Sequence, residues 1–280
     1  MGPEGLLRQE GRRSWPVPVQ WLARLGLGYA CLVGLMSALE SVLVFPAPRI
    51  ASDVLGRAAA EMGAKEVRLQ AEDGTDLYGW RVGETDRLIL YFSGNGSSVG
   101  EGDMYSALLR AGWSTLHINY RGYPGSSGSP SEAGLGLDAQ AAWLEARSSH
   151  PADRIVVMGK SLGGGVAVGL VAGLENEQPG GLVLESTFSS AVAVGAEAYP
   201  WLPVRLLMRN RFDSLAVADR IRCSTLILHG GADEMIGPHH AKALAEAIVG
   251  ARLLEVSGLG HNDRILTHMY AWEAFTTMVP

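Results

Sequence analysis

From about residue 62 to its end, the chain alternates short β-branched or apolar runs with longer segments rich in alanine and leucine. Asp73-Gly74 separates the first two runs and is typical of a hairpin turn. The alternation that follows predicts an α/β fold, with a mostly parallel sheet covered by helices on both faces. The expected strands cover residues 65–70, 77–82, 87–92, 114–119, 154–159, 181–185, 224–229 and 252–257, and the expected helices 102–111, 132–149, 162–174, 239–249 and 263–278.

The stretch 186–222 interrupts this rhythm and is rich in Ala, Leu, Pro and Arg. We interpret it as a short cap insertion over the carboxyl edge of the sheet. Its apolar runs 199–203 and 206–208 either line an acyl pocket, face lipid, or pack on the rest of the domain. The sequence does not choose between these, and the substrate-binding residues stay unknown.

The most apolar stretch lies earlier, at residues 25–44, where Glu40 is the only ionisable group. A helix of this length spans about 30 Å, the thickness of the hydrocarbon core of a bilayer. Pro46 and Pro48 then end any helix. We expect a polar segment over 1–18 and a transmembrane anchor over 19–45. A cleaved signal peptide and an amphipathic or core-packing helix are the alternatives.

Basic residues are more numerous before this apolar stretch than just after it. Because positive charge favours the cytoplasmic side, we expect a single-pass protein with a cytoplasmic N-terminus and an extracytoplasmic domain. The residues compared are Arg8, Arg12, Arg13 and Arg24 against Arg49 and Arg57.

Composition excludes several classes of protein. A content of 47% hydrophobic residues is incompatible with an intrinsically disordered chain. The 29 acidic and 23 basic residues give a net charge of −6, which argues against a nucleic-acid partner. Two cysteines cannot form a disulfide framework. The redox compartment and the oligomeric state stay undetermined.

The strand expected at 154–159 runs into Gly159-Lys160-Ser161-Leu162-Gly163, with a helix to follow. This is the G-x-S-x-G pattern of a nucleophile elbow in its required context, a strand before and a helix after. The small glycines let Ser161 occupy a sharp turn, and the backbone N–H of Leu162 can stabilise an oxyanion. The alternative is a glycine-rich turn that carries a serine by chance.

A serine nucleophile of this kind requires an acid and then a histidine further along the chain. Asp233 and His261 each follow a later expected strand, at the carboxyl end where catalytic groups of α/β sheets gather. We therefore predict Ser161, Asp233 and His261 as a catalytic triad. Glu185 is an alternative acid, because it also ends a strand.

Other chemistries fit the sequence less well. A phosphate-binding loop would need glycine at position 154, which is Arg154. The loop 94–100 resembles a dinucleotide loop, but no acidic residue ends the next strand. Neither C-x-x-C nor H-E-x-x-H occurs, and the pair His239-His240 alone is a weak indication of a metal site. We therefore expect no metal and no cofactor.

Together these motifs resemble the α/β-hydrolase superfamily, and within it the membrane-anchored serine hydrolases. That group includes bacterial esterase-like proteins and eukaryotic depalmitoylase and lysophospholipase types. The resemblance covers nearly the whole chain and implies an α/β-hydrolase domain over 62–280. The motifs that carry it are Val44-Phe45-Pro46, Asp73-Gly74, Gly94-Asn95, Tyr120-Arg121-Gly122-Tyr123, Gly125 to Gly128, Pro130-Ser131-Glu132, Gly159 to Gly163, Glu185 to Phe188, His229 to Asp233 and Gly260 to Asp263.

The resemblance also implies a second oxyanion donor, the backbone N–H of Asn95. Relatives usually carry His-Gly-Asn at this point, whereas this chain has Ser93-Gly94-Asn95. Because the donor is a backbone group, Asn95 is still expected to serve. The expected activity is cleavage of a carboxylic ester or thioester of a small acyl or lipid-like substrate. A serine peptidase and a catalytically silent, membrane-tethered binding module are the alternatives.

Overall fold

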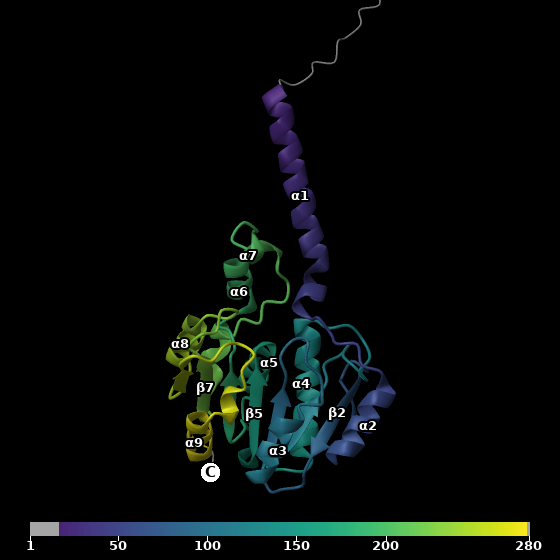
Figure 1. Ribbon diagram of the computed structural model, residues 1–280, viewed down its shortest axis with the longest axis vertical. Helices are drawn as coiled ribbons and strands as arrows, with labels where there is room; N and C mark the ends of the chain where they lie inside the picture. Colours follow the sequence, from purple (N-terminus) through teal and green to yellow (C-terminus); the bar gives the residue numbers. More distant parts are fainter. Residues whose placement is uncertain (1–16, 279–280) are drawn as a thin grey trace, which may run out of the picture. The chain divides into compact units, whose positions relative to one another are not determined.

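The computed structural model describes residues 17–278 (Figure 1). The predicted polar segment 1–18, including Arg8, Arg12 and Arg13, lies almost entirely outside the described residues. Contacts divide the chain into two compact units, residues 1–40 and 41–280. The first unit contains most of α1 (Val17–Val44), a helix that is long and apolar enough to cross a membrane. A signal sequence near the N-terminus would have the same length and composition. The leucines of α1, such as Leu22, Leu25 and Leu27, are exposed.

The second unit is built on one eight-stranded sheet in the order β1-β2-β4-β3-β5-β6-β7-β8. The hairpin of β1 and β2 is antiparallel, as is the pairing of β2 with β4, and all other neighbours are parallel. The mostly parallel sheet predicted from the sequence is confirmed, and each strand end lies within one residue of its expected position. The strands are β1 (Lys65–Gln70), β2 (Asp76–Val82), β3 (Leu88–Phe92), β4 (Ser114–Ile118), β5 (Ile155–Lys160), β6 (Gly181–Glu185), β7 (Thr225–Gly230) and β8 (Arg252–Val256).

Helices cover both faces of the sheet. Alternate residues of each central strand point to opposite faces, and each face carries a buried apolar cluster that helices cover. In β5, Ile155 and Val157 join one buried cluster, whereas Val156 and Met158 join the other. The first cluster packs against α4 (Glu132–Arg147), α5 (Leu162–Gly173) and α8 (Pro238–Ala247). The second packs against α2 (Ser52–Met62), α3 (Gly102–Arg110) and α9 (Met269–Met278).

Two helices differ from the prediction. The amphipathic helix α2 was not expected and ends at Gly63, whose left-handed φ of 66° lets its N–H cap the helix. The last helix begins at Met269 rather than at residue 263. There Asp263 accepts the N–H of Gly260 at 2.7 Å and closes a turn, and a short 3-10 helix, η3 (Ile265–Thr267), follows.

The segment 186–222 contains α6 (Ala191–Ala198), α7 (Val204–Leu207) and the 3-10 helix η2 (Leu215–Arg220). Since it follows β6, it leaves the sheet at the carboxyl ends of the parallel strands, and Figure 1 shows α6 and α7 in green beyond that end. A further 3-10 helix, η1 (Ala152–Arg154), precedes β5. The segment interpreted as a cap insertion folds as a small helical segment that contacts the turn after β5 through Thr187 and the start of α8 through Glu197.

Candidate active site

Ser161 occupies the turn between β5 and α5. Its φ of 51° lies in a region that residues with a side chain seldom adopt, at a cost of about 1–3 kcal/mol. Three hydrogen bonds hold the turn: the Ser161 N–H donates to the Glu185 carbonyl at 2.9 Å, and the Ser161 carbonyl accepts from the Gly164 N–H at 2.9 Å and from Thr187 Oγ1 at 2.7 Å. These hydrogen bonds offset the backbone strain at Ser161. The residue precedes α5, so its hydroxyl lies at the N-terminus of that helix.

The glycines on either side of Ser161 are required by close backbone contacts. A Cβ on Gly159 would lie 2.2 Å from the Gly163 carbonyl oxygen. A Cβ on Gly163 would lie 2.0 Å from the Phe92 carbonyl oxygen at the end of β3. Because real Cβ atoms do not approach other atoms this closely, any side chain at these positions would force the elbow apart.

His261 lies between Ser161 and Asp233. Its Nε2 is 3.0 Å from Ser161 Oγ, and its Nδ1 is 2.8 Å from Asp233 Oδ2. The other carboxylate oxygen, Oδ1, accepts the N–H groups of Met235 at 3.0 Å and Ile236 at 2.8 Å. Since an ionised carboxylate can only accept, Nδ1 carries the proton and Nε2 is left to accept from Ser161. The structure thus brings together the three residues predicted from separate loops.

A second histidine, His229, lies beside the same carboxylate. Its Nε2 donates to the Ile236 carbonyl at 2.8 Å and is 3.4 Å from Asp233 Oδ2. Burial lowers the pKa of His229, so it stays neutral at pH 7. We conclude that His229 supports the loop of Asp233 and that His261 is the histidine that links this loop to Ser161.

Glu185, the alternative acid, points elsewhere. Its Oε1 is 3.2 Å from Lys160 Nζ, and its Oε2 accepts the N–H of Leu266 at 3.1 Å. Lys160 Nζ also donates to the Asp263 carbonyl at 3.1 Å, in the loop that carries His261. Lys160 and Glu185 are register partners on β5 and β6, a relationship that motif reasoning could not reveal. This ion pair therefore joins the nucleophile turn to the histidine loop.

The two expected oxyanion donors, Leu162 and Asn95, belong to two different segments near Ser161, the start of α5 and the loop after β3. Leu162 is the first residue of α5, where a helix has no acceptor of its own for the N–H. Gly94 lies against the nucleophile, since a Cβ there would be 3.5 Å from Ser161 Cβ. Asn95 follows in a turn closed by Ser97 N–H to the Gly94 carbonyl at 3.3 Å. Leu162 thus adjoins the serine in the chain, and the loop of Asn95 passes the serine at Gly94. The oxyanion role of the two N–H groups stays a prediction.

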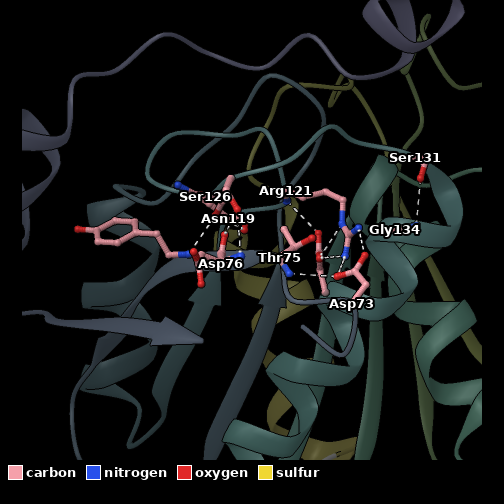
Figure 2. A network of polar contacts seen from close by, with 11 residues as sticks. Asp73, Thr75, Asp76, Asn119, Arg121, Ser126, Ser131 and Gly134 are labelled. Carbon is pink, nitrogen blue, oxygen red and sulfur yellow. Dashed lines mark hydrogen bonds and ion pairs between the residues drawn. The ribbon is translucent and has the colours of Figure 1, made fainter. Parts of the chain in front are cut away.

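Ser93, which stands where relatives usually have histidine, is buried, and its carbonyl accepts the Tyr120 hydroxyl at 2.8 Å. The loop that begins at Tyr120 is fixed in turn by Arg121, as Figure 2 shows. Arg121 Nε donates to Asp138 Oδ1 at 2.9 Å, and Nη1 donates to Asp73 Oδ2 at 2.6 Å. This network, in which Arg121 and Asp138 are buried and Asp73 is exposed, thus supports the loop after β3 from the adjacent strand.

The two carboxylates of this network have different environments. The hydrogen bond from Arg121 holds the pKa of Asp73 at about 2. Burial raises the pKa of Asp138, although Arg121 opposes the shift. In Figure 2 the guanidinium of Arg121 lies between the loop of Asp73 and helix α4, so one cation joins the hairpin, the β4 loop and α4.

Comparison with known proteins places this chain in a family. No protein-family model matches the chain. A protein of Mycobacterium tuberculosis described as uncharacterized is 37% identical over 211 residues, which cover 71% of this chain and 73% of that protein. The alpha/beta hydrolase domain-containing protein WAV2 of Arabidopsis thaliana is 30% identical over 242 residues, 78% of this chain and 77% of that protein. The chain belongs to the alpha/beta-hydrolase family.

Solved structures agree on the fold of this α/β hydrolase. The Pyrococcus furiosus esterase Pf2001 superposes with a TM-score of 0.64 at 19% identity, covering 82% of this chain and 96% of that one. The esterase RhEst1 from Rhodococcus superposes with a TM-score of 0.57 at 18% identity, covering 76% of this chain and 98% of that one. The fold expected from the sequence is therefore confirmed.

Proposed function

We propose that this α/β hydrolase is a membrane-anchored serine hydrolase that cleaves a carboxylic ester or thioester through Ser161, His261 and Asp233. The observation that carries the proposal is the continuous path of hydrogen bonds from Ser161 Oγ to His261 Nε2 at 3.0 Å and from His261 Nδ1 to Asp233 Oδ2 at 2.8 Å. Two structural neighbours described as esterases support the same reaction class.

In the proposed mechanism, His261 Nε2 takes the proton of Ser161 as Oγ attacks the substrate carbonyl. Asp233 holds the imidazole in the required tautomer and stabilises the imidazolium. The N–H groups of Leu162 and Asn95 donate to the oxyanion. His261 then protonates the leaving alcohol or thiol, and water attacks the acyl-enzyme with His261 again as the base.

The membrane part of the proposal rests on α1. Its length matches a bilayer, and residues 25–44 contain one ionisable group, Glu40. The excess of arginines before this stretch favours a cytoplasmic N-terminus and an extracytoplasmic catalytic domain. The exposed apolar side chains of the insertion, Trp201 and Leu206, favour an acyl or lipid-like small molecule over a peptide as substrate.

The proposal is tested with a fluorophosphonate probe on membranes that contain the full-length chain. Labelling is expected in the wild type, lost in Ser161→Ala, and retained in the pellet after a carbonate wash. A Ser148→Ala protein is the matched control, because Ser148 ends α4 on the approach to the amino end of β5, whereas Ser161 follows the carboxyl end of that strand. A folded wild-type protein that does not label would contradict the catalytic assignment, and labelled protein in the supernatant would contradict the anchor.

A substrate panel separates the reaction classes. Acyl esters and thioesters are expected to be hydrolysed much faster than aminoacyl or peptide substrates. The reverse order would assign the same three residues to a peptidase.

A further inference from the structure

Helix α6 of the insertion brings Glu197 to the first turn of α8, next to His239 and His240. Glu197 Oε1 is 3.0 Å from His239 Nε2, and Glu197 Oε2 is 3.4 Å from His240 Nε2. One ligand atom from each of the three residues lies within 4.8 Å of the others. In the sequence the carboxylate is 42 residues from the nearer histidine, so spacing gave no signal of the group.

These separations fit a tetrahedral metal ion. With bonds of about 2.1 Å, two ligand atoms of a tetrahedral ion lie about 3.4 Å apart. The two carboxylate-to-imidazole distances involve different oxygens of Glu197, and one ligand atom from each residue lies within 4.8 Å of the others. A rotation of the exposed carboxylate and of the exposed His239 ring would therefore bring one oxygen and both imidazole nitrogens to three corners. The fourth corner is left for water.

His240 provides an independent indication of a ligand. Its side chain is 2% exposed, and its buried Nε2 has no hydrogen-bond partner within residues 17–278. An unsatisfied polar atom at this depth costs about 1–3 kcal/mol. The opposite ring nitrogen, Nδ1, is 2.8 Å from Ser189 Oγ and 3.4 Å from the Ser189 backbone N. In the tautomer that binds a cation, Ser189 Oγ accepts the Nδ1 proton and Nε2 is the ligand atom.

We propose that Glu197, His239 and His240 bind a zinc-class divalent cation that fastens the insertion to α8. Two imidazoles and one carboxylate are a donor set that suits Zn²⁺. Glu197 belongs to α6, in the connection between β6 and β7, whereas the two histidines belong to α8, between β7 and β8. The bound ion would therefore join two successive connections of the sheet. Its role is structural, and it takes no part in the chemistry at Ser161.

The test is calorimetric titration of Zn²⁺ into the full-length, untagged protein in detergent after chelator treatment. One saturable site per chain is expected. Glu197→Gln and His239→Ala are expected to weaken binding at least about tenfold. Both side chains are more than half exposed, so their replacement leaves the fold intact. Glu246→Gln removes an exposed carboxylate from α8, the helix of the two histidines, and serves as the matched control. Its affinity for Zn²⁺ is expected to be unchanged.

Hydrogen exchange gives a second readout. Zn²⁺ is expected to slow exchange in residues 191–198 of the wild type and to have no such effect in Glu197→Gln, while the sheet is unaffected in both. The proposal is overturned if the wild type has no saturable site, or if Glu197→Gln and His239→Ala bind Zn²⁺ as tightly as the control. Neither readout depends on the proposed hydrolase activity.

Discussion

Lys160 Nζ donates to the Asp263 carbonyl at 3.1 Å while it pairs with Glu185 Oε1 at 3.2 Å. The residue before the nucleophile is thereby connected to the loop that carries His261. Because Glu185 is 3% exposed, its carboxylate depends on this partner for compensation of its charge.

Replacement of this lysine, Lys160→Met, is expected to lower the free energy of unfolding by about 3 kcal/mol, because a buried carboxylate loses its counter-ion. Urea unfolding measures the change. The double variant Lys160→Met/Glu185→Gln is expected to lose less than the sum of the single changes. Lys65→Met, which breaks the exposed pair with Glu84, is the control and should cost less than about 1 kcal/mol. Equal losses for the two lysines would contradict the structural role of Lys160.

The assignment of the acid is tested by Asp233→Asn. Asparagine Oδ1 can still accept the N–H groups of Met235 and Ile236, but its amide group would donate to His261 Nδ1 and place the ring proton on Nε2. A ring in that tautomer cannot accept the proton of Ser161, so kcat is expected to fall by about 10⁴ with the fold retained. Steady-state hydrolysis of a short acyl ester measures it. Glu185→Gln should retain far more activity, and the opposite ranking would make Glu185 the acid.

The elbow glycines allow a comparison of two alanine substitutions. In Gly163→Ala the new Cβ meets the Phe92 carbonyl at 2.0 Å, and we expect a loss of about 3 kcal/mol or more, because neither backbone segment can move freely. Gly136→Ala lies at an exposed position inside α4, where a Cβ meets nothing within 4 Å, and should gain up to about 1 kcal/mol. Thermal or urea unfolding distinguishes them. Similar effects at both positions would show that the elbow tolerates a side chain.

Stability at acid pH should depend on His117, a fully buried residue whose Nδ1 lies 2.6 Å from the Tyr105 hydroxyl. Burial lowers the pKa of His117 from 6.5 to about 3. Between these values the unfolded chain binds a proton that the folded chain does not, so stability falls as pH falls, by about 1.4 kcal/mol per pH unit. In His117→Leu this part of the slope should disappear. Unfolding curves measured from pH 6 to pH 4 test this, and parallel dependences in the two proteins would refute it.

Much of the fold follows from local patterns. The central strands β3 to β7 are short, mostly apolar runs bounded by turn residues, and such runs are visible in the sequence because these strands are buried on both faces. Ser161, Asp233 and His261 were found because each follows a strand. Helix α2 was missed because its single amphipathic face is short and lies between the apolar stretch and the first strand. The roles of the three residues stay a prediction until activity is measured.

Contacts between elements distant in the sequence were not predictable in this way. The pairing of Lys160 with Glu185 depends on the register of β5 and β6, which no motif specifies. The approach of Glu197 to His239 depends on how the insertion folds back. Likewise, Arg121 belongs to a recognisable motif, but its two carboxylate partners come from the hairpin turn and from α4.

The two edge strands of the sheet, β1 and β8, affect whether sheets of different molecules associate edge to edge. Within residues 17–278 each has a neighbouring strand on one side only, so one edge of its backbone forms no hydrogen bonds to another strand there. Both strands carry charged side chains: Lys65, Glu66 and Arg68 on β1, and Arg252 and Glu255 on β8. Charges on an edge strand oppose the addition of a strand from another molecule. In the anchored state proposed above, copies of the chain would share one membrane at high local concentration, and these polar edges would oppose the merging of their sheets.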